Sequence, residues 1–224
     1  MSVFSDRNLA LKYMPHFLRD SLDPFPVLHI GCTVAEAPMD SPSFSRLRLD
    51  PAAEGADRII EYALYFDYDI QHLYDLEHAW VAVKDNRVIG CWCSFHGMRL
   101  CASGVADLYR LEDGVPVLYI QPGKHSILPD PRLFGLHTQA QTCCRRLCGG
   151  GLLVPDMLSD RMRTDPRQDE MIRGYIRRHF AFTPSWEFVP ETIHPDRVTD
   201  WEALKQAIPQ YVRGQLDKIR QEEA

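Results

Sequence analysis

Apolar and polar residues alternate along the middle of the chain in a way that predicts β-strands. Residues 58–66 place Ile60, Leu64 and Phe66 on one face and the intervening side chains on the other. Residues 79–83 and 88–93 are rich in β-branched and aromatic side chains, and residues 116–121 form a shorter apolar run. Residues 27–30 form another candidate strand. The pattern predicts an antiparallel sheet in the first part of the chain.

After residue 131 the apolar positions follow a helical spacing. Residues 136–147, residues 169–180 and a stripe from Trp201 to Ile219 predict helices, and residues 8–13 predict a short helix near the start. Thr199 or Asp200 is the expected cap of the last helix, and Pro209 is expected to kink or restart it. We therefore expect a mainly β fold with α: one domain over residues 1–224, with an antiparallel β-sandwich core (about 1–130) covered by a mostly helical segment (131–224).

The runs 79–83 and 88–93 are joined by a short polar segment that contains Asp85-Asn86. Both residue types tolerate left-handed backbone angles, so a two-residue hairpin turn is expected there. Counting outward with a constant register places four polar residues on one face at the open end of the hairpin: Asp75 opposite His96, and Glu77 opposite Ser94. His72 would fold over this end, and His78 would point to the other face.

Two carboxylates on one face repel each other unless a proton or a cation lies between them. The density of acids and imidazoles therefore predicts a divalent metal site, with these candidate ligands: Asp69, His72, Asp75, Glu77 and His96. Mixed oxygen and nitrogen ligands suit Mn, Fe or Zn, whereas carboxylates with water suit Mg or Ca. The alternative is a salt-bridged polar strand end with hydrogen-bonded histidines.

Two further histidines are candidate general acids or bases. His125 follows the 116–121 strand and lies in a predicted loop, where strands commonly present functional side chains. His78 is adjacent to the acidic block. The alternative for His125 is an exposed loop histidine without a role.

These residues also carry a family resemblance. The segments YALYFDYDIQHLYDLEHAWVAV, SFHG and PVLYIQPGKHS resemble the vacuolar protein-sorting-associated family numbered sixty-two. They are similar, more distantly, to the necrosis- and ethylene-inducing-peptide-like toxins, whose His-x-x-Asp-x-Glu block binds a divalent cation on a β-sandwich. His72, Asp75 and Glu77 match that spacing, and the toxins' upstream aspartate would fall on Asp69 or Asp67. The resemblance covers about residues 9–130.

Two departures limit what this resemblance implies. The toxins carry Trp where this chain has Leu76, and they are secreted, disulfide-bonded proteins. The start of this chain lacks the long apolar core of a secretory signal, which favours a cytoplasmic protein. The membrane-damaging role of the toxins is therefore not expected here.

Composition narrows the classes of function. The 224 residues carry a net charge of −6 and no concentrated basic patch, which argues against a nucleic-acid partner. No apolar run is long enough to span a bilayer. The seven cysteines are odd in number and are expected to be reduced. Cys143-Cys144-x-x-x-Cys148 could form part of a metal cluster, but helix packing is the favoured interpretation.

The sequence leaves two functions open, because it has no serine-hydrolase, phosphate-loop or dinucleotide motif. The first is a metal-dependent hydrolase of a phosphoester or another polar ester. The second is a non-catalytic, cation-stabilised module that binds a small polar ligand or a lipid head group. Whether the protein is an enzyme is not decided by the sequence, and neither is its oligomeric state.

Overall fold

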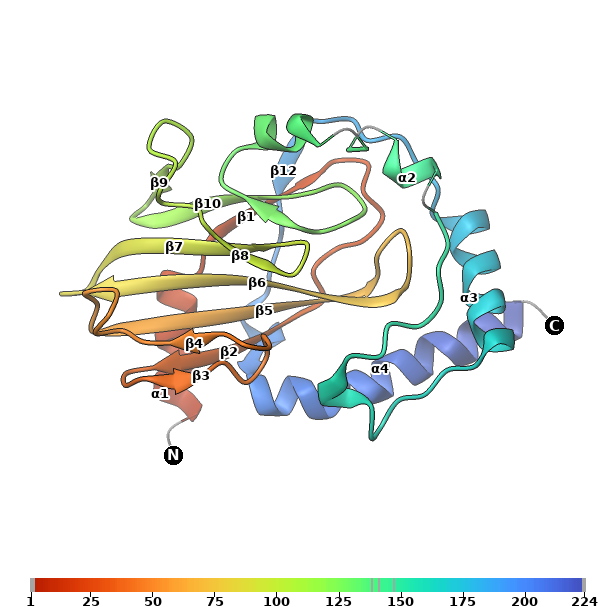
Figure 1. Cartoon of the computed structure of the whole chain (residues 1–224), viewed down its shortest axis with the longest axis horizontal. Helices are drawn as coiled ribbons and strands as arrows, with labels where there is room; N and C mark the ends of the chain where they lie inside the picture. The colour runs from red at the N-terminus through yellow and green to blue at the C-terminus, as the bar shows by residue number, and fades with distance from the viewer. Residues whose placement is uncertain (1–2, 138, 141, 147, 223–224) are drawn as a thin grey trace.

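The computed structural model describes residues 3–137, 139–140, 142–146 and 148–222, and its core is built from two β-sheets (Figure 1). The larger sheet has six strands in this order: β13 (Val198–Asp200), β2 (His29–Ala35), β5 (Arg58–Tyr68), β6 (Leu73–Lys84), β7 (Arg87–Phe95) and β8 (Met98–Cys101). The other sheet runs in the order β11 (Ile127–Leu128), β10 (Val115–Ile120), β1 (His16–Asp20) and β12 (Phe188–Pro190), with β9 (Leu111–Glu112) paired to β10. A separate small hairpin joins β3 (Met39–Asp40) to β4 (Arg48–Leu49).

Among the strands of the described residues most pairs are antiparallel, and β1–β10 and β13–β2 are the parallel ones. Tyr62, Leu64 and Phe66 of β5 are fully buried and share one hydrophobic core with Leu118 and Ile120 of β10. We call this side of the larger sheet the inner face. The predicted fold class, an antiparallel β-sandwich with a helical C-terminal portion, is confirmed.

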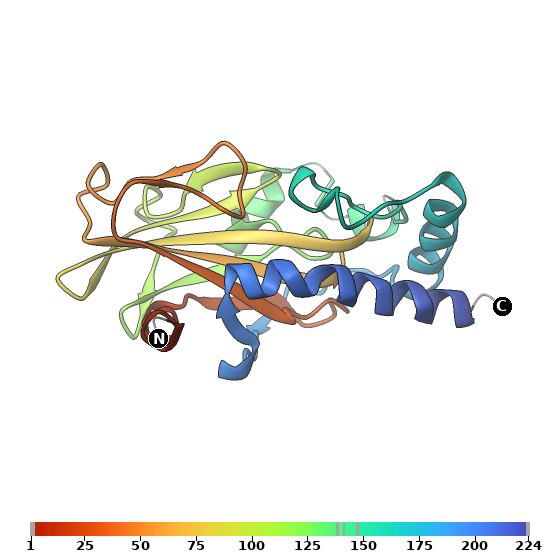
Figure 2. The same ribbon diagram turned by 90° about the horizontal axis from the view of Figure 1, so that it is seen from below.

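Helix α4 (Trp201–Glu222) and the small hairpin cover the opposite, outer face of the larger sheet. The long helix runs along β2 and β5, as Figure 2 shows from below. The contact is close at Gly31, where an added Cβ would lie 2.9 Å from a Leu204 methyl carbon. Asp200 is the cap of α4, since its carboxylate accepts a hydrogen bond from the Ala203 backbone N–H at 2.8 Å. The helix continues through Pro209 rather than restarting there.

The remaining helices are shorter, and one sequence prediction fails among them. They are α1 (Val3–Tyr13), α2 (Cys143–Arg146), α3 (Pro166–His179) and the single-turn 3₁₀ segments at Pro131–Leu136, Asp156–Leu158 and Pro195–Arg197. The predicted helix over 136–147 is wrong for the residues that are described, because only α2 is helical; residues 138, 141 and 147 lie outside them. Successive turns, such as His137 N–H to Phe134 O, replace a continuous helix.

The hairpin turn lies where the sequence predicts it. The strand register beyond the turn differs from the predicted one. Asp85 and Asn86 have φ angles of 48° and 59°, and Lys84 pairs with Arg87. The register then shifts between Val83 and Ala82, because Ile89 is an extra residue on β7. Ala79 consequently pairs with Cys93, one residue beyond the predicted partner. A shift of one residue reverses which side chains share a face, so the predicted pairing of Asp75 with His96 is wrong.

No helix within the described ranges is long and apolar enough to cross a membrane.

Candidate functional site

The candidate site lies at one end of the sandwich, where two loops meet. The loop after β5 contains Asp69 and Ile70, and the loop after β10 contains Gly123, Lys124 and His125. The Ile70 backbone N–H donates to Gly123 O at 2.8 Å, which fastens the loops together. Segments that are about fifty residues apart in the chain are thereby brought side by side (Figure 1).

Asp75 and His125 form a buried pair in this region. Asp75 lies on the inner face of β6, opposite Phe66 of β5. His125 Nδ1 is 3.2 Å from Asp75 Oδ2, and the imidazole stacks on Phe66 with ring centroids 3.9 Å apart. Phe25 contacts the same imidazole edge-on. His125 is fully buried, and its Nε2 has no hydrogen-bond partner among the described residues.

Glu77 follows Asp75 on the same face of β6 and is also buried. The Ser94 hydroxyl donates to Glu77 Oε2, and Ser126 Oγ lies 3.5 Å from Oε1, a weak contact. Ser94 therefore contacts Glu77, as the sequence suggested, although the strand register differs.

The two carboxyl groups have pKa values displaced in opposite directions. Burial raises the pKa of Glu77 well above its usual range, and the adjacent Asp75 carboxylate raises it further. Burial also acts to raise the pKa of Asp75, but the hydrogen bond with His125 and the charge of His72 outweigh it and hold that pKa below its usual value. The pair accordingly carries one negative charge and one proton over the range between the two values.

Asp69 is held by a different set of partners. Its Oδ1 accepts the backbone N–H groups of Gln71 and His72, while Oδ2 pairs with the Lys124 ammonium. Burial acts to lower the pKa of Lys124, but Asp69 together with the charges of Asp75 and Glu77 raises it. His72 Nδ1 lies 2.8 Å from Tyr74 O. Lys124 is thus the positive charge that faces the acids of this end.

His96 lies at the wall of a cavity instead of opposite Asp75. Its backbone N–H donates to Ser126 Oγ at 3.2 Å, and its ring is 5.5 Å from that of His137. Burial lowers the pKa of His96, and the positive charges of Lys124 and His137 lower it further. The cavity has a volume of about 290 Å³ and is lined by Gln71, His96, Gln121, Lys124, His137, Gln139 and Cys143. We call it the polar cavity.

Gln121 gives the polar cavity a specific feature. Its side chain is buried, and its Oε1 has no hydrogen-bond partner within the part of the chain that is described. An unpaired buried carbonyl costs about 1–3 kcal/mol, which a ligand with a donor group could recover. Sequence analysis missed Gln121, His137 and Lys124, since nothing in their local sequence distinguishes them from surface residues.

His78 belongs to a second buried cluster on the outer face, which we call the outer cluster. His78 Nε2 lies 3.0 Å from Ser43 Oγ, and its ring stacks on Trp80. Burial lowers the pKa of His78. The predicted orientation of His78, away from Asp75 and Glu77, is what the structure has, so His78 and His125 lie on opposite sides of the sheet.

Glu61 is the acid of the outer cluster, and sequence analysis did not single it out. Its carboxylate accepts hydrogen bonds from Ser41 Oγ and Ser43 Oγ, both at 2.6 Å, and from Trp80 Nε1 at 2.7 Å. The Ser43 hydroxyl proton is directed at Glu61, so Ser43 is not activated by His78 as a nucleophile would be. The outer cluster fastens the segment before β4 to the sheet.

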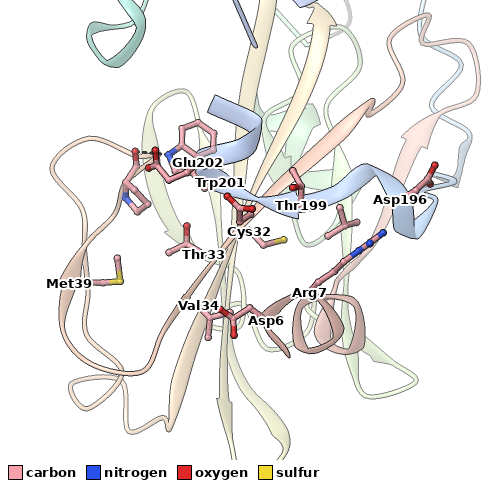
Figure 3. A pocket seen from close by; sticks show the side chains of 13 residues that line it. Asp6, Arg7, Cys32, Thr33, Val34, Met39, Asp196, Thr199, Trp201 and Glu202 are labelled. Carbon is pink, nitrogen blue, oxygen red and sulfur yellow. Dashed lines mark hydrogen bonds between the residues drawn. The ribbon is translucent and has the colours of Figure 1, made fainter. Parts of the chain in front are cut away.

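The largest of the described cavities, of about 610 Å³ (Figure 3), shares no lining residue with the polar cavity, but its wall includes Pro42, between Ser41 and Ser43 of the outer cluster. It lies between α1, β2 and the start of α4, with Cys32, Val34 and Met39 among its lining residues. Acidic side chains from four elements also line it: Asp6, Asp196, Asp200 and Glu202. Asp200 is already engaged as the cap of α4. None of the candidate residues from the sequence analysis lines this cavity.

The predicted ligands suit a divalent ion by their chemistry but do not converge in this arrangement. Within the described residues, no group of three or more His, Cys, Asp or Glu side chains is placed to hold a metal ion. Each acid already has a protein partner: Lys124 for Asp69, His125 for Asp75 and Ser94 for Glu77. The metal centre stays a prediction, and an ion would have to displace Lys124 or His125.

Comparison with known proteins gave no relative: no protein-family model, curated protein or solved structure matches this chain.

Proposed function

We propose that the protein is a cation-stabilised binding module for a small polar ligand. The single observation that carries this proposal is the pair of buried carboxyl groups, Asp75 and Glu77, whose pKa values are displaced in opposite directions beside the polar cavity. A divalent cation would allow both groups to ionise and would remove the repulsion between them. Asp75 and Glu77 would hold the ion, with Asp69 and His72 as further ligands.

The polar cavity is the proposed site of the ligand. Lys124, His96 and His137 offer donors to an oxygen-rich molecule, and Gln121 Oε1 requires a donor in return. A small molecule with both acceptor oxygens and a hydroxyl or amino group meets these requirements. The volume of about 290 Å³ suits a ligand at the small end of the range.

Binding is favoured over hydrolysis by the positions of the two candidate acid–base residues. His125 is sealed between Phe25 and Phe66 with no exposed surface, so it cannot reach a substrate in the cavity. His78 is on the other side of the sheet. A general acid or base must come within hydrogen-bond distance of the reacting group.

A metal-dependent hydrolase of phosphoesters or other polar esters is the second candidate, and His96 is the observation that favours it. This imidazole lines the polar cavity, and its lowered pKa keeps it in the neutral, proton-accepting form at pH 7. We expect His96→Ala to lower any such turnover by about 10²- to 10⁴-fold. A screen of phosphoesters and carboxylesters with added Mn²⁺, Mg²⁺, Ca²⁺ or Zn²⁺ is the assay, and absence of turnover rejects this candidate.

Calorimetric titration with the same four ions tests the binding proposal. The variant D75N/E77Q keeps the shape of both side chains but removes their charge, so it should abolish ion binding. The variant D196N/E202Q is the matched control, because it neutralises the same two residue types at the largest cavity. Equal ion affinity in wild type and D75N/E77Q would contradict the proposal. Absence of binding of all four ions to the wild type would contradict it as well.

Lys124→Met sharpens the same experiment. The Lys124 ammonium competes with a metal ion for the charge of Asp69, Asp75 and Glu77. We expect its removal to tighten ion binding about tenfold, which corresponds to about 1.4 kcal/mol. Weaker ion binding in this variant would show that Lys124 supports the ion site instead of competing for it.

A further inference from the structure

A pair of adjacent thiols lies at the wall of the polar cavity and has no part in the function proposed above. Cys143 and Cys144 begin α2, and both side chains are buried. Their Sγ atoms are 3.7 Å apart. Cys144 Sγ is also 3.2 Å from Pro122 O, in the loop that carries Lys124 and His125. The two sulfurs are thus held against the same loop as the candidate site.

The packing around this pair depends on a glycine. A Cβ added to Gly123, which has φ of 69°, would lie 2.7 Å from Cys144 Sγ. Any other residue at this position would displace the thiol, so the absence of a side chain at Gly123 allows the two sulfurs to meet. Cys148 does not join them, because its Sγ contacts Ile176 O of α3 at 3.5 Å.

The contact between the two thiols displaces their pKa values in opposite directions. The hydrogen bond with Cys144 lowers the pKa of Cys143 in opposition to burial, and the positive charge of Lys124 lowers it further. The same hydrogen bond, followed by burial, raises the pKa of Cys144. Cys143 is therefore the thiol of the pair that loses its proton more readily. A thiolate is the form of cysteine that binds metal ions.

The separation of the sulfurs suits a shared metal ion better than a disulfide. Two thiolates bound to one tetrahedral ion with bonds of about 2.3 Å have sulfurs about 3.8 Å apart. A disulfide requires about 2.05 Å, so its formation would need a movement of the short helix. Cys143 lines the polar cavity, which gives an ion and its water ligands a route to the sulfurs.

We propose that Cys143 and Cys144 form a dithiolate site for a soft, thiophilic divalent metal ion of the zinc and cadmium class. The ion forms two metal–sulfur bonds and displaces the proton of each thiol to solvent, so that M²⁺ + 2 RSH gives M(SR)₂ + 2 H⁺, with no electron transfer. Water completes the coordination from the cavity. Soft thiolate ligands separate this site from the oxygen ligands of Asp75 and Glu77, which suit harder ions.

Titration of the reduced protein with Cd²⁺ tests this site through the ultraviolet charge-transfer absorbance of cadmium–thiolate bonds. We expect one Cd²⁺ per chain in the wild type and loss of the band in Cys143→Ser, in Cys144→Ser and in the double variant. Cys148→Ser and Cys101→Ser are the matched controls, since each removes one thiol elsewhere, and both should keep the band. A band that survives in the double variant, or that disappears in Cys148→Ser, overturns the proposal.

Two further measurements keep the result independent of folding and of the proposed function. In the wild type, bound Cd²⁺ should protect Cys143 and Cys144 from alkylation, as mapped by mass spectrometry, while exposed Cys101 stays reactive; equal alkylation with and without Cd²⁺ overturns the proposal. The variant D75N/E77Q should keep the cadmium–thiolate band even if it loses the binding of harder ions. Loss of the band there would mean that the two sites are one.

Discussion

Two buried acids on opposite faces of the same sheet have opposite surroundings. Glu61, on the outer face, accepts three hydrogen bonds of 2.6–2.7 Å. Glu77, on the inner face, has one hydroxyl donor and one weak contact, and a second carboxylate is its neighbour. The first acid is satisfied by the fold, whereas the second needs a proton or a cation.

The comparison teaches where chemistry is to be sought in this molecule. Each cluster combines a carboxylate, a histidine and a serine, so residue types alone do not separate them. In the outer cluster the carboxylate has three donors and Ser43 links it to His78 Nε2, although His78 Nδ1 has no partner among the described residues. In the inner cluster, His125 Nε2 lacks a partner among the described residues, and so does Gln121 Oε1 at the adjacent cavity. An unpaired imidazole nitrogen thus occurs in both clusters, and the two adjacent carboxyl groups of the inner cluster are what distinguish it as the candidate site.

The largest expected effect is on folding stability and concerns Glu61. Glu61→Ala would leave the donors of Ser41, Ser43 and Trp80 unpaired in a buried region. We expect the free energy of unfolding to fall by about 3–5 kcal/mol, since each buried unsatisfied group costs about 1–3 kcal/mol. Glu77→Gln should change it by less than about 1 kcal/mol below pH 4.5, because the Glu77 carboxyl group is itself protonated and neutral there. Urea denaturation of both variants measures the change in the free energy of unfolding. Equal decreases in the two variants would contradict the distinction drawn between the two acids.

The next effect is the contribution of Glu77 to the pH dependence of the free energy of unfolding. Its folded-state pKa is raised above the usual 4.5, so the stability from keeping it protonated is present below that pH and is lost as pH rises towards the folded value. The wild type should therefore lose up to about 1.4 kcal/mol per pH unit relative to Glu77→Gln over that interval. Asp75 has the opposite sign, since its pKa is lowered from 3.8 and its contribution is lost only at more acidic pH. If the free energy of unfolding changed with pH in parallel for wild type and Glu77→Gln above pH 4.5, the raised pKa assigned to Glu77 would be contradicted.

The smallest effect compares two hydroxyl deletions. Ser43→Ala removes a 2.6 Å hydrogen bond to Glu61, and we expect a loss of about 1–2 kcal/mol. Ser126→Ala removes a contact of 3.5 Å to Glu77 and a bond of 3.2 Å from the His96 backbone, and we expect less than about 1 kcal/mol. Thermal unfolding of the two variants provides the measurement. A larger loss for Ser126→Ala would mean that Glu77 depends on its hydroxyl donors more than these distances indicate.

Local signals were sufficient for several parts of the fold. The turn at Asp85-Asn86, the strand over most of 58–68 and the helix that begins after Asp200 each follow from side chains a few residues apart. The crowding of acids and histidines between Asp69 and His78 also pointed correctly to an unusual, buried polar region. The bulge at Ile89 was not predictable, because an extra residue in a strand is stabilised by packing on its partners and not by its own sequence.

The sequence by itself determined the alternation that builds the sandwich, the hairpin turn and the face on which Asp75 and Glu77 lie together, because these depend on period-two geometry and on nearby residues. Only the tertiary structure decided the partners of these acids. It brought His125 to Asp75, Lys124 to Asp69 and the Cys143–Cys144 pair to the loop at Gly123. It also placed the serine donors beside Glu61. Those contacts join segments 18 to 55 residues apart, and they form because folding a closed sandwich buries their polar groups together, where each must find a partner or keep a proton.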